Sequence, residues 1–197
     1  MRVRDSVLIL LPCLASLSCA GQVRSTPAPV ARAAPGGGAD FRDVLLGDLT
    51  GRPQRFGDAL GRRPALVSFW APWCESCVRE APALQRLSRQ AGACGAAVLG
   101  VAVGENRQSV ERFTHDRRID FQQLTDPDFH LADALGQRRI PATLVLDAQQ
   151  AIVYTGEALD LAAIGALKRA IASARPTVTA GAAAPAAAAP AGECPLR

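Results

Sequence analysis

Two continuous apolar runs, each followed by a segment with helical spacing, constrain the fold of this chain most strongly. The runs are PALVSF at residues 64–69 and AAVLGVAV at 96–103. Strands that are covered on both faces have such runs, because neither of their faces meets water. Residues 75–91, 107–118 and 160–174 place apolar side chains at helical spacing. Strands that alternate with helices predict an α/β fold with a mixed sheet.

The other elements of the folded part are expected to be short. The segment before the first apolar run predicts two strands around a turn at 49–53, followed by one turn of helix. Between the second apolar run and the last helix we expect, in chain order, a strand at 119–124, a short helix at 128–135 that Gly136 closes, and antiparallel strands at 142–147 and 151–156.

The two ends of the chain differ in composition from its middle. Arg2 and Arg4 precede an apolar run from Val7 to Leu17, which is typical of an export signal over residues 1–19. The run is shorter than the roughly 18 to 20 residues that a membrane span needs. Two further segments are rich in Pro, Ala and Gly and predict a flexible linker and a disordered tail, which leaves one folded domain. The expected bounds are 20–39 for the linker, 40–174 for the domain and 175–197 for the tail.

The signal sequence is compatible with two kinds of processing. Ser18 and Ala20 suit an ordinary signal peptidase, which would cut after Ala20. Cys19 followed by Ala20 instead resembles the lipid-modified cysteine of a bacterial lipoprotein, although Ser16 stands where such a signal usually has leucine. Both alternatives predict a periplasmic or cell-envelope protein, and membrane attachment is expected only through a lipid on Cys19.

The charge pattern argues against a nucleic-acid partner. Arginine and lysine number 22, aspartate and glutamate number 18, and the formal net charge is +4. Acidic residues are interleaved with the arginines, whereas a nucleic-acid-binding protein concentrates its basic residues in a patch or stripe. We therefore expect a mixed surface with no nucleic acid bound. The protein is also expected to be a monomer.

Four of the six cysteines remain after the signal is set aside. They are Cys74, Cys77, Cys94 and Cys194. Disulfides form and persist in the compartments that exported proteins reach. Cys94 and Cys194 are not closely spaced, and we hypothesise a structural disulfide between them. The alternatives are a buried free thiol at Cys94 and an unpaired Cys194 that is open to partners.

Cys74 and Cys77 are separated by only two residues and follow the first apolar run. This position places Cys74 at the start of a helix and Cys77 one turn inside it. Unpaired amides and the helix dipole lower the pKa of a thiol at a helix start, which makes Cys74 the expected nucleophile and Cys77 the resolving thiol. A zinc site would need two further ligands, and the two histidines, His115 and His130, are expected on helix surfaces. We therefore predict redox chemistry without a metal or another cofactor.

The sequence around these cysteines resembles a known superfamily. LVSFWAPWCESC is similar to thioredoxins, and FWAPWCESCVREAPALQRL resembles their exported TlpA/ResA-like branch, which has a glutamate and a proline at the positions of Glu80 and Pro82. RRIPATLVLD, far downstream, resembles the superfamily loop whose cis-proline, here Pro141, packs against the disulfide. The resemblance implies a thioredoxin-like three-layer sandwich with a mixed central sheet, an amino-terminal hairpin and an inserted helix and strand at 107–124.

The same resemblance implies a thiol-disulfide oxidoreductase that acts on exported protein thiols or disulfides. Cytochrome c apoproteins are a frequent substrate in this branch, and a membrane thiol-disulfide carrier is the expected electron donor. Glu80 would relay a proton or raise the thiol pKa values; alternatively, it is a solvated glutamate paired with Arg79 or Arg86. The expected catalytic residues are Cys74, Cys77, Glu80 and Pro141, and the expected substrate-binding residues are Trp70, Trp73 and Ile140.

The sequence departs from the superfamily pattern at two places. Ser68 stands where thioredoxin has a buried aspartate, and Glu75 with Ser76 stands where the second residue is most often proline. Glu75 and Glu80 both oppose formation of a thiolate, whereas Arg79 favours it. A stabilised thiolate makes a strong oxidant, so we predict that this protein is a reductant.

Two other functions use related folds. A peroxidase of the peroxiredoxin type would need the threonine of a TxxC motif, and Ala71 stands at that position. A Sco-type copper-binding protein would need cysteines three residues apart and a histidine near the loop that here carries Pro141. The sequence disfavours both functions.

Overall fold

The computed structural model describes residues 40–174 together with Cys194 and Leu196. The predicted export signal at 1–19, the candidate lipidation site Cys19, the linker at 20–39 and the rest of the predicted tail lie outside the described residues. Within the described part, no helix is both long enough and apolar enough to cross a membrane.

A seven-stranded mixed sheet forms the centre of the described chain, with the strand order β2-β1-β5-β4-β3-β6-β7. The neighbours β3, β4 and β5 are parallel, whereas β6 runs antiparallel to β3. The predicted mixed sheet is therefore confirmed. The strands are β1 (Leu45–Asp48), β2 (Pro53–Arg55), β3 (Ala65–Trp70), β4 (Ala97–Val103), β5 (Gln123–Asp126), β6 (Ala142–Leu146) and β7 (Ile152–Gly156).

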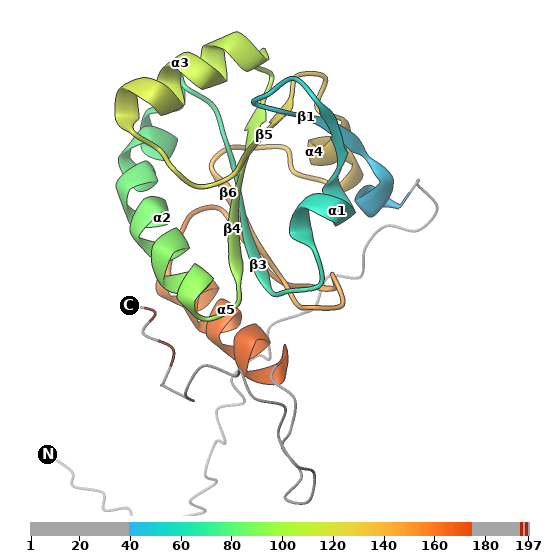
Figure 1. Cartoon of the computed structure of the whole chain (residues 1–197), viewed down its shortest axis with the longest axis vertical. Coiled ribbons are helices and arrows are strands. Elements are labelled where there is room, and N and C mark those ends of the chain that lie inside the picture. The colour runs from blue at the N-terminus through green and yellow to red at the C-terminus, as the bar shows by residue number, and fades with distance from the viewer. Residues whose placement is uncertain (1–39, 175–193, 195, 197) are drawn as a thin grey trace, which may run out of the picture. The chain divides into compact units, whose positions relative to one another are not determined.

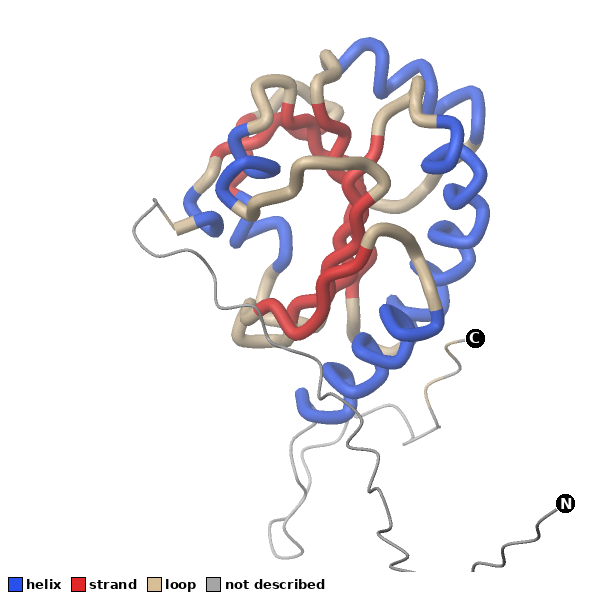
Figure 2. The backbone as a smooth tube through the Cα atoms, turned by 180° about the vertical axis from the view of Figure 1, so that it is seen from behind, coloured by secondary structure: helices blue, strands red, loops and turns tan. Residues whose placement is uncertain are grey.

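Helices cover both faces of this sheet and complete three layers (Figure 1). The longest helix, α2, lies with α3 and α5 on one face, whereas α1 and α4 lie on the other. Seen from behind, the twisted strands again lie between two groups of helices (Figure 2). The helices are the 3-10 helix η1 (Phe41–Asp43) and α1 (Phe56–Leu60), α2 (Glu75–Ala93), α3 (Arg107–Arg117), α4 (His130–Ala134) and α5 (Leu161–Ala174).

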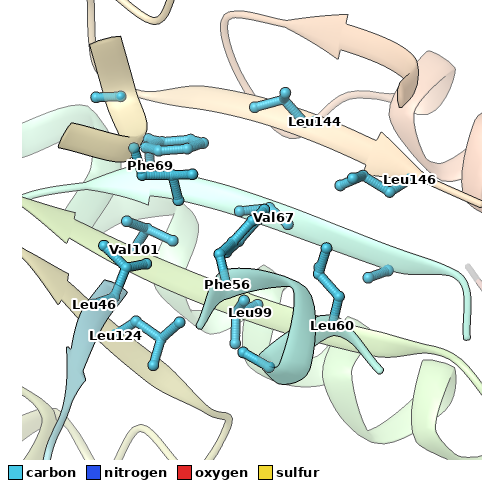
Figure 3. Close-up of a cluster of buried hydrophobic side chains, with 14 of the residues drawn as sticks. Leu46, Phe56, Leu60, Val67, Phe69, Leu99, Val101, Leu124, Leu144 and Leu146 are labelled. Carbon is cyan, nitrogen blue, oxygen red and sulfur yellow. The ribbon is translucent and has the colours of Figure 1, made fainter. Parts of the chain in front are cut away.

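The pleat of β3 explains the two cores. Val67 and Phe69 point to the face that α1 and α4 cover, where Phe56 and Leu60 of α1 belong to the same buried cluster (Figure 3). Leu66, on the opposite face, packs in a second cluster with residues of α2 and α5. Burial of one Leu, Val or Phe side chain stabilises the fold by about 1.5–3 kcal/mol, so both layers of helices are held by a strand that is apolar throughout.

One predicted strand lies at a different position. The sequence pattern predicts a strand at 119–124, whereas β5 begins at Gln123 and pairs with β4 from Gly100 onward. Ile119 and Phe121 pack against the core from the connection that precedes the strand. Because these two side chains pack against the core, the sequence is apolar there, but neither residue belongs to the pairing of β5 with β4.

The order of strands brings two loops to the same end of the sheet. Trp70 ends β3, and the chain then enters the loop that leads to α2. Ala142 begins β6 and pairs with Phe69 across the antiparallel ladder. The Ile140–Pro141 peptide, which is cis, therefore lies at the end of the sheet from which Cys74 and Cys77 emerge.

Candidate active site

Cys74 is the N-cap of α2. Its backbone is extended (φ −81°, ψ 101°), and its carbonyl accepts the first helical hydrogen bond from the Val78 amide at 3.0 Å. Its Sγ lies 3.3 Å from the amide nitrogen of Cys77, which donates to it. The sulfur therefore occupies the place of the side-chain oxygen of an ordinary N-cap, where unpaired amides and the helix dipole favour negative charge.

The structure joins Cys74 to Cys77 in a disulfide with a Cα–Cα distance of 5.3 Å. Both cysteines are buried, with exposed fractions of 7% for Cys74 and 4% for Cys77. Cys77 faces the sheet one turn inside the helix, and Cys74 lies at the helix start. The arrangement fits an attacking thiol at the helix start and a resolving thiol behind it.

Ser76 adds a second polar contact to Cys74 that sequence reasoning missed. Its Oγ lies 3.4 Å from Cys74 Sγ. The signal was the absence of proline at this position, because a serine there supplies both a hydroxyl group and an extra backbone amide. After reduction, the hydroxyl of Ser76 and the amide of Cys77 would both face the Cys74 thiolate and stabilise it.

The two tryptophans have different surroundings. Trp70 is buried beside Cys74 and Cys77, and its ring lies 5.0 Å from that of Phe113. Trp73 is 66% exposed next to the disulfide. Trp70, which was expected to bind substrate, is instead a buried residue that packs beneath the two cysteines. Of the two tryptophans, Trp73 is the one whose exposed ring a protein partner can contact.

Gln123 holds Trp70 in place and was not predicted. Its Oε1 accepts a hydrogen bond of 3.0 Å from Trp70 Nε1, and its Nε2 donates to the carbonyl of Phe121. A Cβ atom at Gly100 would lie 2.0 Å from Gln123 Oε1, so only glycine leaves room for this amide. Two sequence features point to this contact: Gln123 is a polar residue in a predicted strand, and Gly100 lies in the middle of the apolar run at 96–103.

Glu80 lies on the inward face of α2, one turn beyond Cys77. Burial raises its pKa, and a hydrogen bond from the backbone amide of Leu159 partly offsets this. Its Oε2 is buried and has no hydrogen-bond partner among the described residues. The alternative of a solvated glutamate paired with Arg79 or Arg86 is therefore wrong. A half-buried carboxyl with a raised pKa on this face is suited to exchange a proton with a buried thiol.

The charges at the surface of the helix start compensate each other. Arg79 donates to the carboxylate of Glu75 at 2.6 Å, and the glutamate side chain is 90% exposed. Because the pair is neutral overall and faces water, its net effect on Cys74 is small. Glu80 is thus the acidic group of the motif that acts from inside the protein.

The loop before β6 contributes Ile140 and Pro141. Ile140 packs against the cluster that contains Cys74, Cys77 and Trp70. The antiparallel pairing of β6 with β3 brings this loop to the disulfide although it is distant in sequence. Ile140 therefore lies beside the site, and the cis bond to Pro141 lies in the same loop.

The second disulfide lies at the other end of α2. Cys94 is the C-cap of the helix, and the structure joins it to Cys194, the pairing expected from the sequence. Both cysteines pack against the core cluster of α2 and α5, in which Leu196 is 2% exposed. The end of the chain is thus attached to the domain by a covalent bond and by one buried leucine.

Among residues 40–174, Cys194 and Leu196, no group of three or more His, Cys, Asp or Glu side chains could hold a metal ion. His115 is 90% exposed, and His130 is also exposed, as predicted for helix surfaces.

A model of the AhpC/TSA family matches residues 38–155. The chain belongs to the AhpC/TSA family. Among its relatives, the thiol-disulfide oxidoreductase ResA of Geobacillus thermodenitrificans is 32% identical over 110 residues, which are 56% of this chain and 63% of that protein. ResA of Bacillus subtilis is 23% identical over 151 residues, or 77% of this chain and 81% of that protein. The match with the Geobacillus protein thus spans less than two thirds of that relative's length.

Solved structures of family-like proteins share the fold. A secreted disulfide oxidoreductase of Mycobacterium tuberculosis, described as homologous to E. coli DsbE, is 25% identical with a TM-score of 0.53 and covers 68% of this chain and 97% of its own. A thioredoxin-like protein of Neisseria meningitidis, solved in solution, is 26% identical with a TM-score of 0.57 and covers 70% of this chain and 91% of its own. The predicted thioredoxin-like sandwich and the predicted resemblance to ResA are therefore confirmed.

Proposed function

We propose that this family member is a thiol-disulfide oxidoreductase that acts on proteins outside the cytoplasm through Cys74 and Cys77. The observation that carries the proposal is the position of Cys74: it caps a helix, its sulfur faces the amide of Cys77, and it is bonded to a cysteine one turn away. The similarity to proteins named thiol-disulfide oxidoreductase supports it.

The reaction needs two exchange steps. The Cys74 thiolate attacks one sulfur of the substrate disulfide; a Cys74–substrate bond forms, the substrate S–S bond breaks, and its second sulfur leaves as a thiolate that takes up a proton. Cys77 then loses its proton to Glu80 and attacks Cys74 Sγ, which forms the Cys74–Cys77 bond and releases the second substrate thiol. Two electrons pass from this protein to the substrate, and a dithiol carrier must return them.

We propose the reducing direction because Glu80 opposes the charged form of a thiol from inside the protein. A dithiol enzyme whose thiolate is strongly stabilised has a stable reduced form and therefore acts as an oxidant. An enzyme whose thiols stay neutral lacks this stabilisation and gives up its electrons more readily. The amide of Cys77 and the hydroxyl of Ser76 act the other way on Cys74. We propose that the half-buried carboxyl of Glu80 limits this stabilisation of the thiolate, because water screens it less than it screens the exposed Glu75.

The proposed setting is the periplasm or cell envelope. The predicted export signal at 1–19 supports it, and secreted proteins are among the structural neighbours. A lipid on Cys19 would hold the domain near a membrane thiol-disulfide carrier through the linker at 20–39. The Cys94–Cys194 bond is proposed to be structural, and the protein is proposed to act as a monomer.

Three assays separate the candidate functions. We expect the reduced protein to reduce insulin and a small model disulfide, to leave peroxide largely unconsumed because Ala71 supplies no hydroxyl, and to bind no stoichiometric copper. Cys74→Ser is the control for each activity. Copper binding or peroxide turnover in the absence of disulfide reduction would contradict the proposal.

The substrates can be captured with Cys77→Ser. Without the resolving thiol, Cys74 should stay bonded to its partner, so a mixed disulfide should accumulate that thiols release. Cys74→Ser should trap nothing. Equal trapping by both variants would contradict the assigned roles.

A further inference from the structure

A groove of about 340 Å³ lies between α2 and the end of α3 and is lined from Val78 to Arg89 along α2. Its apolar lining includes Val78, which directly follows Cys77, together with Pro82 and Ile119. Its rim carries three arginines, which are Arg86, Arg89 and Arg117. The groove thus combines an apolar floor with cationic edges.

The structure leaves part of this positive charge uncompensated. Arg89 lies 3.5 Å from the carboxylate of Asp120. Within residues 40–174, Cys194 and Leu196, neither Arg86 nor Arg117 forms an ion pair with a carboxylate, and the guanidinium of Arg117 lies 5.2 Å from the centre of the Phe113 ring. Two guanidinium groups therefore remain available to an anionic ligand.

The fold fixes the position of the groove relative to the disulfide. The side-chain amide of Gln85 donates to the carbonyl of Arg118 at 2.8 Å, which ties α2 to the end of α3. From Val78 to Arg89 the helix rises by about 16 Å at 1.5 Å per residue. An extended peptide covers that distance with about five residues.

We propose that this groove binds an acidic segment of the protein partner that lies close in sequence to the partner's redox cysteine. Carboxylates on such a segment would pair with Arg86 and Arg117, since a guanidinium presents two parallel donors to a carboxylate. Apolar side chains between the carboxylates would contact Val78 and Ile119. The groove thereby selects substrates by charge and orients the partner sulfur toward Cys74. This inference rests on the proposed oxidoreductase function and gives it a substrate class.

Three synthetic peptides test the inference. In each peptide, one intramolecular disulfide is flanked by three glutamates, by three glutamines or by three lysines. For the reduced full-length protein we expect kcat/KM to be highest for the glutamate peptide and about fivefold to tenfold lower for the lysine peptide at low salt, with the difference reduced by added salt.

The decisive variant is Arg86→Glu with Arg117→Glu, which should reverse the order of the peptides. Arg62→Glu with Arg63→Glu is the matched control, because these exposed arginines make the same change in net charge at the opposite end of β3. Retention of the wild-type order in the Arg86/Arg117 variant, or equal rates for the three peptides, would overturn the inference.

A binding measurement separates this inference from the proposed function. Fluorescent versions of the peptides with serine in place of both cysteines report binding by anisotropy without any exchange reaction. Preferential binding of the glutamate peptide supports the groove even if no peptide is turned over. Reduction of a small model disulfide without charge-dependent binding would retain the oxidoreductase and reject the groove.

Discussion

The two ends of α2 make the same covalent bond in opposite electrostatic surroundings. Cys74 caps the N-terminus, where the amide of Cys77 points at its sulfur. Cys94 caps the C-terminus, where unpaired carbonyls and the negative end of the helix dipole disfavour a thiolate. A disulfide whose thiolate is stabilised is easier to reduce, so the first bond is suited to exchange and the second to permanence.

The two bonds also close loops of different size. The cysteines are 3 residues apart in the first disulfide and 100 apart in the second. Cross-linking a long loop removes much more conformational freedom from the unfolded chain than cross-linking a short one. The comparison therefore predicts that changes at one end of the helix alter activity and that changes at the other alter stability.

The largest effect is expected from Cys74→Ser. Disulfide reduction should fall to the uncatalysed rate because no nucleophile remains, whereas the free energy of unfolding should fall by less than it does when the long loop of the second disulfide is opened. Turnover of insulin and chemical denaturation of the same sample check both parts. Substantial residual reductase activity would assign the attack to another cysteine.

At the other end, Cys194→Ser should lower the free energy of unfolding by about 2–4 kcal/mol, because the long loop is no longer closed. Reduction of a small model disulfide should remain at the wild-type rate. Leu196→Ala is a useful companion, since it removes the buried anchor and keeps the bond. A loss of activity without a loss of stability in Cys194→Ser would contradict the structural role.

Glu80→Gln should slow turnover by about a hundredfold, the usual contribution of a positioned acid or base. Burial raises the pKa of Glu80, so the folded state binds more protons than the unfolded state between the ordinary and the raised pKa values. Wild-type stability therefore decreases as the pH rises through that interval, and the variant should lack this decrease. Denaturation and activity measured across pH check the prediction.

Glu75→Gln provides the matched control for that experiment. It removes an exposed glutamate from the same helix, where Arg79 compensates the charge. Its pH profiles should follow those of the wild type. If both variants changed the profiles equally, the effect would come from net charge and not from the half-buried carboxyl of Glu80.

The smallest effect is expected from Gln123→Ala, which leaves the buried Nε1–H group of Trp70 without its acceptor. The cost in stability should be about 1–3 kcal/mol. We also expect a shift in the reduction potential of the Cys74–Cys77 pair, because Trp70 packs against both cysteines. Gln122→Ala is the control, since its side chain is exposed and donates a hydrogen bond to the side chain of Gln54. Equal effects of the two substitutions would remove Gln123 from the site.

The sequence predicted those parts of the site that depend on local spacing. Cys74 and Cys77 at a helix start follow from a buried strand and a short spacing, and Pro141 follows from a short motif. Gln123 could not be found in this way, because its role depends on the register of β5 against β4 and on the space beside Gly100. The start of β5 was misplaced for a related reason: periodicity reports burial and does not report ladder pairing.

The groove along α2 and the contact of Glu80 with Leu159 could not be predicted from sequence patterns for the same reason. Arg86 and Arg117 belong to different helices, and their proximity follows from the packing of α2 against the end of α3. Leu159 meets Glu80 only because the connection after β7 reaches the inward face of α2. Long-range packing therefore determines the electrostatics of a site whose reacting atoms are predictable locally.

The order in which the two disulfides are reduced tests the central claim most directly. The oxidised protein is equilibrated with increasing amounts of a dithiol, free thiols are alkylated, and mass spectrometry identifies the modified cysteines. We predict that Cys74 and Cys77 become labelled first, while Cys94 and Cys194 stay bonded until much stronger reducing conditions. Labelling of Cys94 and Cys194 before, or together with, Cys74 and Cys77 would contradict the account.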